Sequence, residues 1–156
     1  MTTMTIYNIA LITHLAGLAI MAGATIQDFS ITQQFWKHFA ADRSRGLAIR
    51  EARARSPLFF GIGAACLIVS GVTMMFLTNG VFGEQVWFRI KFGLVILLII
   101  NGILLGRLQA GRLGKLLKEG AGESSLLKVK GNISRFHLLQ LTLFLVVFCL
   151  SVFKFN

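Results

Sequence analysis

The chain has 156 residues, of which 55% are hydrophobic and 14% are charged, and its mean hydropathy is +0.74. This composition is too apolar for a water-soluble domain and indicates an integral membrane protein surrounded by a lipid bilayer. The formal net charge of +10 could suggest nucleic-acid binding, but the Lys and Arg residues gather in two segments between apolar runs. Basic loops beside an anionic membrane surface explain that distribution, so no nucleic-acid partner is predicted.

Four apolar segments are each long enough to cross a hydrocarbon core, which needs about 20 helical residues. They predict an all-α, integral membrane four-helix bundle with helices at residues 6–27, 58–77, 87–108 and 133–155. We expect residues 1–156 to form a single transmembrane domain. An amphipathic segment at 31–55 is expected to lie at the membrane interface as an extension of the first helix. The glycine-rich stretch 111–125 predicts a mobile loop or a short surface helix.

The basic residues predict the orientation of the bundle. Six Lys and Arg residues lie between the first two apolar segments, and seven more run from Arg107 to Arg135. By the positive-inside rule both runs are expected in the cytoplasm. Both termini are therefore predicted on the non-cytoplasmic side.

Two cations at the start of the third apolar segment go against this rule. Arg89 and Lys91 are expected to enter the membrane from the non-cytoplasmic side. One explanation is snorkelling, in which their long stems reach back to the lipid headgroups beside Trp87. The other is that they belong to a site, and Lys91 lies one helical step deeper than Arg89.

The two cysteines are predicted at different depths. Cys66 and Cys149 lie about 12 Å and about 24 Å from the cytoplasmic ends of their helices, at a rise of 1.5 Å per residue. A disulfide between them is not expected. Both are interpreted as small buried apolar residues.

At the cytoplasmic end, opposite charges are predicted to face each other. Gln27 and Asp28 finish the first helix, and Arg135 and His137 begin the fourth. This arrangement predicts an ion pair between Asp28 and Arg135 that fixes the helix ends, with His137 capping its helix or snorkelling. His38 is expected to be a surface histidine.

His14 is the polar residue that most needs an explanation, because it lies about 12 Å deep in an apolar segment. Inside a bundle it needs a hydrogen-bond partner or a metal. Three interpretations stay open, namely a structural histidine, a haem or metal ligand, and a proton relay. Lys91, Met74 and Met75 are predicted in the same outer layer and could supply a cation and soft donors.

A haem b held between two histidines is not expected. The predicted depths of His14 and His137 differ by about 12 Å in a core of about 30 Å, and two axial ligands must lie closer than that. Haem bound through His14 would instead take Met74 or Met75, water, or no residue as the opposite ligand. Arg89 or Lys91 would then neutralise a propionate.

Several segments together resemble the bacterial membrane protoporphyrinogen oxidase family. They are a histidine early in the first helix, "RSPL" before the second, "WFRIKFGLVILLIINGILLGRL" as the third, and "RF" before a fourth that ends in "VFKF". Parts of this pattern are shared with the copper-resistance D membrane family. The chain departs from the oxidase pattern in two places. In "TIQDFS" it lacks the second histidine that is usual near the end of the first helix. In "RFHLLQ" it lacks the Asn and the Glu of the "RF-x-N-E" pattern that begins the fourth helix of the family.

The resemblance implies a function and a location. It matches His14 to the haem-associated histidine of the family and Lys91 to the lysine of its third helix. It implies removal of hydrogen from protoporphyrinogen IX in the bacterial inner membrane, with haem passing electrons to a respiratory-chain acceptor.

Three functions are therefore carried forward. The first is a haem-binding redox protein acting on a porphyrinogen-like substrate, in which Lys91 binds a carboxylate or assists proton removal. The second is a non-catalytic membrane subunit or partner-binding bundle. The third is a copper-handling protein that uses His14 with Met21, Met74 or Met75. The sequence leaves a homo-oligomer open.

Overall fold

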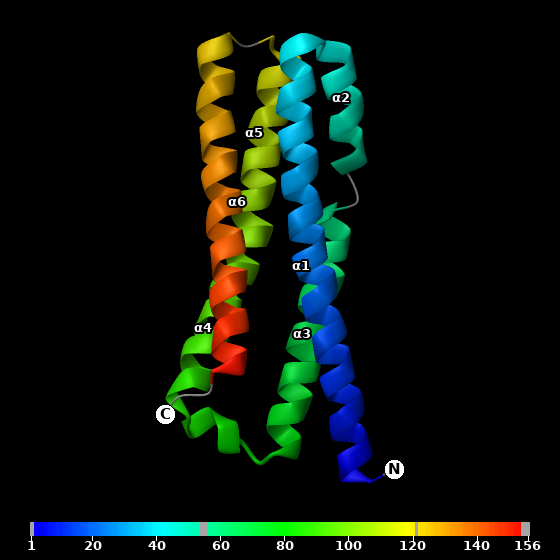
Figure 1. The fold of residues 1–156 in the computed structure, drawn as a ribbon, viewed down its shortest axis with the longest axis vertical. Helices are drawn as coiled ribbons and strands as arrows, with labels where there is room; N and C mark the ends of the chain where they lie inside the picture. The colour runs from blue at the N-terminus through cyan, green and yellow to red at the C-terminus, as the bar shows by residue number, and fades with distance from the viewer. Residues whose placement is uncertain (1, 54–55, 121, 154–156) are drawn as a thin grey trace.

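The computed structural model describes residues 2–53, 56–120 and 122–153, which are helical almost throughout and contain no strand (Figure 1). Four helical stretches are long and apolar enough to cross a membrane. The predicted all-α fold is thereby confirmed. The elements in chain order are α1 (Thr3–Ala41), α2 (Arg43–Ala52), α3 (Ser56–Leu77), the 3-10 turn η2 (Val81–Glu84), α4 (Val86–Ile100), the π-helix η3 (Asn101–Leu105), α5 (Gly106–Lys118) and α6 (Glu123–Val152).

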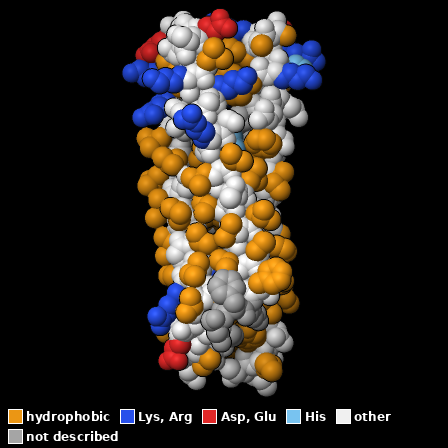
Figure 2. All heavy atoms as spheres, turned by 60° about the vertical axis from the view of Figure 1, so that its left-hand side comes forward, with side chains coloured by type: hydrophobic (Ala, Val, Ile, Leu, Met, Phe, Trp, Pro, Cys, Tyr) orange, Lys and Arg blue, Asp and Glu red, His pale blue; other side chains and the backbone are white. Residues whose placement is uncertain are grey.

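The long helices run side by side along one axis, and both termini lie at the same end of the bundle (Figure 1). We call this the termini end. The opposite end, where α1 meets α2 and α5 meets α6, carries most of the Lys and Arg side chains, above a belt of hydrophobic ones (Figure 2). We call it the basic end. A hydrophobic belt with a charged collar is the surface expected of a protein in a bilayer.

The helices extend beyond the predicted spans at the basic end. α1 continues without a break to Ala41, and α2 folds back beside it (Figure 1). The predicted extension of the first helix is thus present as far as Ala41. Its aromatic face is packed, because Phe35 of α1, only 2% exposed, contacts the core formed with Leu113 and Ile133 of the neighbouring helices.

The glycine-rich segment is largely helical, which excludes a loop over most of it and leaves the helical alternative. It continues α5 up to Lys118, and α6 begins at Glu123. Leu113 and Leu117 are buried in the same core as Phe35. Tertiary packing of these leucines therefore outweighs the low helix propensity of the glycines.

In the hydrophobic belt the helices associate in two pairs, with α3 packed along α1 and α4 packed along α6. One core joins the pairs through Met21 and Ala24 of α1, Leu67 of α3, Leu98 of α4 and Leu143 of α6. Both cysteines are free, and Cys66 is half-buried at the contact between α1 and α3. Cys149 is exposed on α6, so its predicted burial is wrong.

Asp42 connects α1 to α2 and caps the second helix. Its Oδ1 accepts hydrogen bonds from the Ser44 hydroxyl at 2.7 Å and from the backbone N–H groups of Ser44 and Arg45 at 2.8 and 3.3 Å. The bond from the Ser44 hydroxyl, followed by those from the two backbone N–H groups, holds the pKa of the Asp42 carboxyl below its usual value of 3.8.

This cap predicts a pH-dependent stability of α2. Because the folded pKa of Asp42 is lowered, its contribution is complete above the unfolded value of 3.8 and is lost as the pH falls through the folded value. Asp42→Ala is expected to speed amide hydrogen exchange in α2 at pH 7, since N-terminal N–H groups lose their acceptor. Asp42→Asn should keep the protection of these amides, and that protection should no longer change over the pH range in which the Asp42 carboxyl titrates. Equal exchange in all three proteins would contradict the cap.

Candidate functional site

His14 lies at the contact between α1 and α3, in the half of the bundle nearer the termini. Its Nδ1 is 3.0 Å from the Oγ of Ser70, a residue only 3% exposed. The same Oγ lies 2.5 Å from the backbone oxygen of Cys66 and 3.3 Å from that of Leu67. A carbonyl oxygen can only accept, so the Ser70 hydroxyl must donate its hydrogen to one of them.

This chain of bonds determines the tautomer of His14. Since the hydroxyl hydrogen of Ser70 is used by the α3 backbone, the contact with His14 requires an Nδ1–H donor. Nε2 then carries the lone pair, and the ring is further held by a hydrogen-bonding interaction with the Leu67 backbone of α3. A neutral imidazole whose N–H is anchored and whose other nitrogen carries a lone pair is the form that binds metals.

Lys91 on α4 is the charged neighbour of this histidine, and its ammonium interacts electrostatically with the His14 ring. The ring also contacts α3, because a Cβ placed on Gly71 would lie 3.5 Å from His14 Cε1. Met74 is half-buried one helical turn after Ser70. The structure thus places Lys91 near enough for its charge to act on His14, the two residues that the sequence predicted in one layer.

Arg89 and Met75 point elsewhere. Arg89 is exposed, and its Nε donates to the backbone oxygen of Gly83 in η2 at 2.8 Å. The methyl group of Met75 lies beside the same glycine, 3.5 Å from where a Cβ would be. These two side chains therefore hold the turn η2 at the termini end. Trp87 is buried, and its Nε1 donates to Gln85.

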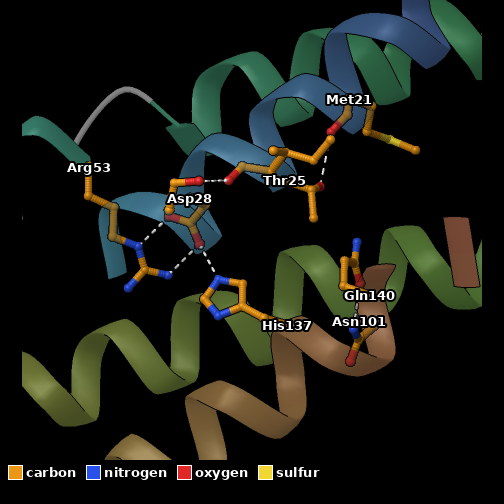
Figure 3. A network of polar contacts seen from close by, with 9 residues as sticks. Met21, Thr25, Asp28, Arg53, Asn101, His137 and Gln140 are labelled. Atoms are coloured by element: carbon orange, nitrogen blue, oxygen red, sulfur yellow. Dashed lines mark hydrogen bonds and ion pairs between the residues drawn. The ribbon is translucent and has the colours of Figure 1, made fainter. Parts of the chain in front are cut away.

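At the basic end a second polar cluster joins three helices (Figure 3). Asp28 of α1 accepts from Arg53 Nε at 2.5 Å and Nη2 at 2.8 Å, and its Oδ2 lies 2.9 Å from His137 Nε2. His137 is 1% exposed, with the rings of Phe29 and Phe136 edge-on to its imidazole. Asp28 therefore ties α6 to α1 and to the end of α2.

The predicted pair between Asp28 and Arg135 is wrong. Arg135 is exposed on α6. It lies two residues before His137, and two residues rotate about 200° around a helix with 3.6 residues per turn, which turns Arg135 to the opposite face. His137 neither caps its helix nor snorkels, because it is buried against Asp28.

Asn101 and Gln140 form a buried link between η3 and α6. Asn101 Nδ2 donates to Gln140 Oε1 at 2.5 Å, and Gln140 Nε2 donates to the backbone oxygen of Leu98 at 3.1 Å. Asn101 also begins the π-helix, which the Gly106 N–H closes by donating to the Asn101 carbonyl. π-turns inside α-helices are frequent at functional sites.

A cavity of about 610 Å³ adjoins this cluster and is lined by residues of α1, α2, α3, η3, α5 and α6. Asp28, Arg53, His137 and Gln140 are among its walls. His14 lines neither of the two cavities described. The two polar clusters are therefore separate features of the bundle.

Comparisons with protein-family models, with curated proteins and with solved structures find no match for this chain. The two polar clusters therefore carry the functional inference. Within residues 2–53, 56–120 and 122–153, no group of three His, Cys, Asp or Glu side chains is placed to hold a metal ion. His14 offers a single protein nitrogen, which is the number that a haem iron needs on one side.

Proposed function

We propose that the protein is a multi-pass membrane redox protein that binds haem b through Nε2 of His14. The observation that supports this proposal is the hydrogen bond that fixes Nδ1–H on Ser70 at 3.0 Å and leaves Nε2 with its lone pair. Histidines that bind metals usually donate their other N–H to a neighbouring acceptor, which fixes the ring orientation. Ser70 has that role here, and its own hydroxyl is in turn fixed by the α3 backbone.

Lys91 supplies a positive charge beside His14. In a medium of low dielectric constant such a charge pairs with a carboxylate, either a haem propionate or a carboxylate of the substrate. Bound haem would supply one-electron transfer to a respiratory-chain acceptor. The resemblance to the protoporphyrinogen oxidase family suggests a porphyrinogen-like substrate.

The orientation in the membrane belongs to the same proposal. The basic end carries the Lys and Arg residues of α2, of α5 and of the beginning of α6. The positive-inside rule puts such segments in the cytoplasm. His14 and both termini would then lie toward the non-cytoplasmic face of a bacterial inner membrane.

The visible absorption spectrum of the detergent-purified protein, oxidised and dithionite-reduced, tests the haem site. We expect a Soret band in the wild type that is absent in His14→Ala at equal yield. Ser70→Ala should keep the band but weaken haem affinity by about 10- to 100-fold, because it removes the group that orients the ring. His38→Ala, a histidine change outside the cluster, is the matched control and should leave the spectrum unchanged.

Two results would overturn the proposal. One is the absence of a band even after reconstitution with haem, and the other is a band that persists in His14→Ala. The first would favour a non-catalytic bundle in which His14 and Ser70 satisfy each other between α1 and α3, and the second would show that other residues bind the haem. In the first case both variants should lose only stability, by about 0.6–2 kcal/mol, as for other hydrogen bonds between membrane helices.

A further inference from the structure

The cavity at the basic end is not used by the proposed redox function. Its volume is about 610 Å³, and residues of α3 face residues of η3 and α5 across it. Asp28 on its wall is fourteen residues after His14 on the same helix, which puts it about 21 Å from that histidine at 1.5 Å per residue. A ligand in this cavity would therefore lie far from an iron bound to His14.

One part of the cavity wall is apolar. It is built by side chains and glycines of α3 and η3, namely Pro57, Phe60, Gly61, Gly102 and Ile103. The glycines keep the space open. A Cβ on Gly61 would meet nothing within 4 Å, whereas one on Gly102 would lie 2.3 Å from the Phe60 ring. Such a wall suits a hydrocarbon chain or an apolar ring.

The other part of the wall carries charge. Three arginines line it, and they are Arg50, Arg53 and Arg107. Arg53 is bound to Asp28, but neither Arg50 nor Arg107 has a hydrogen bond or ion pair with any residue described. The lining residues include two acidic ones, Asp28 and Glu51, and Glu51 is exposed. Two arginines against one exposed carboxylate leave a positive charge available to a ligand.

Ser56 adds an unsatisfied donor to the same wall. It is 4% exposed, and its Oγ has no hydrogen-bond partner among the described residues. Buried hydroxyl groups are rarely left without a partner, because their desolvation is costly. Ser56 also begins α3, so the positive end of the dipole of a 22-residue helix lies beside it. A missing partner and a helix N-terminus both point to an anionic group.

From these features we propose that the cavity binds an anionic amphiphile. Its apolar body would lie against Phe60 and Ile103, and its phosphate or carboxylate would be bound by Arg50, Arg107 and the Ser56 hydroxyl. The volume falls within the range of about 300–1,000 Å³ that is usual for small-molecule sites. The amphiphile has two sources, an anionic phospholipid of the membrane or a free amphiphilic acid.

Native mass spectrometry of the full-length protein tests this site with three probes. They are dioleoylphosphatidylglycerol, oleate, and dioleoylphosphatidylcholine as the zwitterionic control. Gly61→Leu fills the cavity without a clash at its Cβ, and Arg107→Gln removes an available charge. Gly23→Leu, whose Cβ would also meet nothing within 4 Å, and Arg135→Gln, which changes an exposed arginine at the same end, are the matched controls.

We expect at least one anionic probe to bind in preference to phosphatidylcholine. Arg107→Gln should weaken its binding by at least about tenfold, the effect of one lost charge-assisted hydrogen bond, and Gly61→Leu should abolish it. Both control variants should bind as the wild type does. Binding of phosphatidylglycerol would identify a lipid as the ligand, and binding of oleate alone would identify a free acid.

The proposal is overturned if neither anionic probe binds, or if binding is the same in the cavity variants and in their controls. Circular dichroism and gel filtration of each variant separate these outcomes from misfolding. His14→Ala should retain the anionic probe. The cavity site and the haem site can therefore fail independently of each other.

Discussion

Replacing Asp28 by Asn is expected to lower the free energy of unfolding by about 2–4 kcal/mol, the cost of removing one partner from a mostly buried charge cluster. The Asp28 carboxylate binds Arg53 through both oxygens and His137 through one. The side chains of Arg53 and His137 are 14% and 1% exposed, so water cannot replace the lost acceptor fully. The variant would leave a guanidinium and an imidazole without their anion.

Unfolding in detergent, followed by circular dichroism, measures this loss. A double-mutant cycle with Arg53→Gln should show a coupling energy of about 0.5–3 kcal/mol, because the two residues are in direct contact. Glu119→Gln is the matched control, since it breaks an exposed pair with Lys115 at 3.8 Å that contributes at most about 1 kcal/mol. If Asp28→Asn is no more destabilising than Glu119→Gln, Asp28 does not hold α1, α2 and α6 together.

Hydropathy predicted the membrane-length helices because a run of about 20 apolar residues has few alternatives. It could not predict where those helices end at the basic end. The aromatic face around Phe35 has the same pattern whether it meets lipid headgroups or other helices, and its partners Leu113 and Ile133 are distant in the chain. The π-helix at Asn101 was also not foreseen, and the side chain that bonds to Asn101 and to the Leu98 carbonyl beside it, Gln140, belongs to another helix.

For the sites, the sequence identified single residues better than their partners. His14 and Lys91 stood out because polar and charged side chains are rare in an apolar segment, and in the structure the charge of Lys91 acts on His14. Ser70, which fixes the tautomer of His14, was missed because a serine in a membrane helix usually bonds to its own backbone. Asp28 was assigned the wrong partner because the return of α2, which delivers Arg53, cannot be read from the charge pattern.

The second large effect on stability is expected at Gly63, because this glycine allows α1 and α3 to touch through their backbones. A Cβ on Gly63 would lie 2.7 Å from the Gly17 carbonyl oxygen and 2.8 Å from the Met21 amide nitrogen. Neither atom can rotate away as a side chain could, so Gly63→Ala must push the helices apart. We expect a loss of about 1–3 kcal/mol in the free energy of unfolding, as for other overpacked sites. Gly23→Ala on α1 is the control, since its Cβ would meet nothing within 4 Å.

The same variant should also disturb His14, because His14 bonds to Ser70 across the same contact between α1 and α3. That bond is 3.0 Å long, and hydrogen bonds weaken steeply when a helix shift lengthens them. For the proposed haem site, Gly63→Ala is therefore expected to reduce haem affinity in the direction of Ser70→Ala, whereas Gly23→Ala should change neither the spectrum nor the stability by much. A Gly63→Ala protein with the wild-type unfolding midpoint would show that the helices do not pack this closely. A protein that loses stability but keeps its haem affinity would separate the packing of the pair from the orientation of His14.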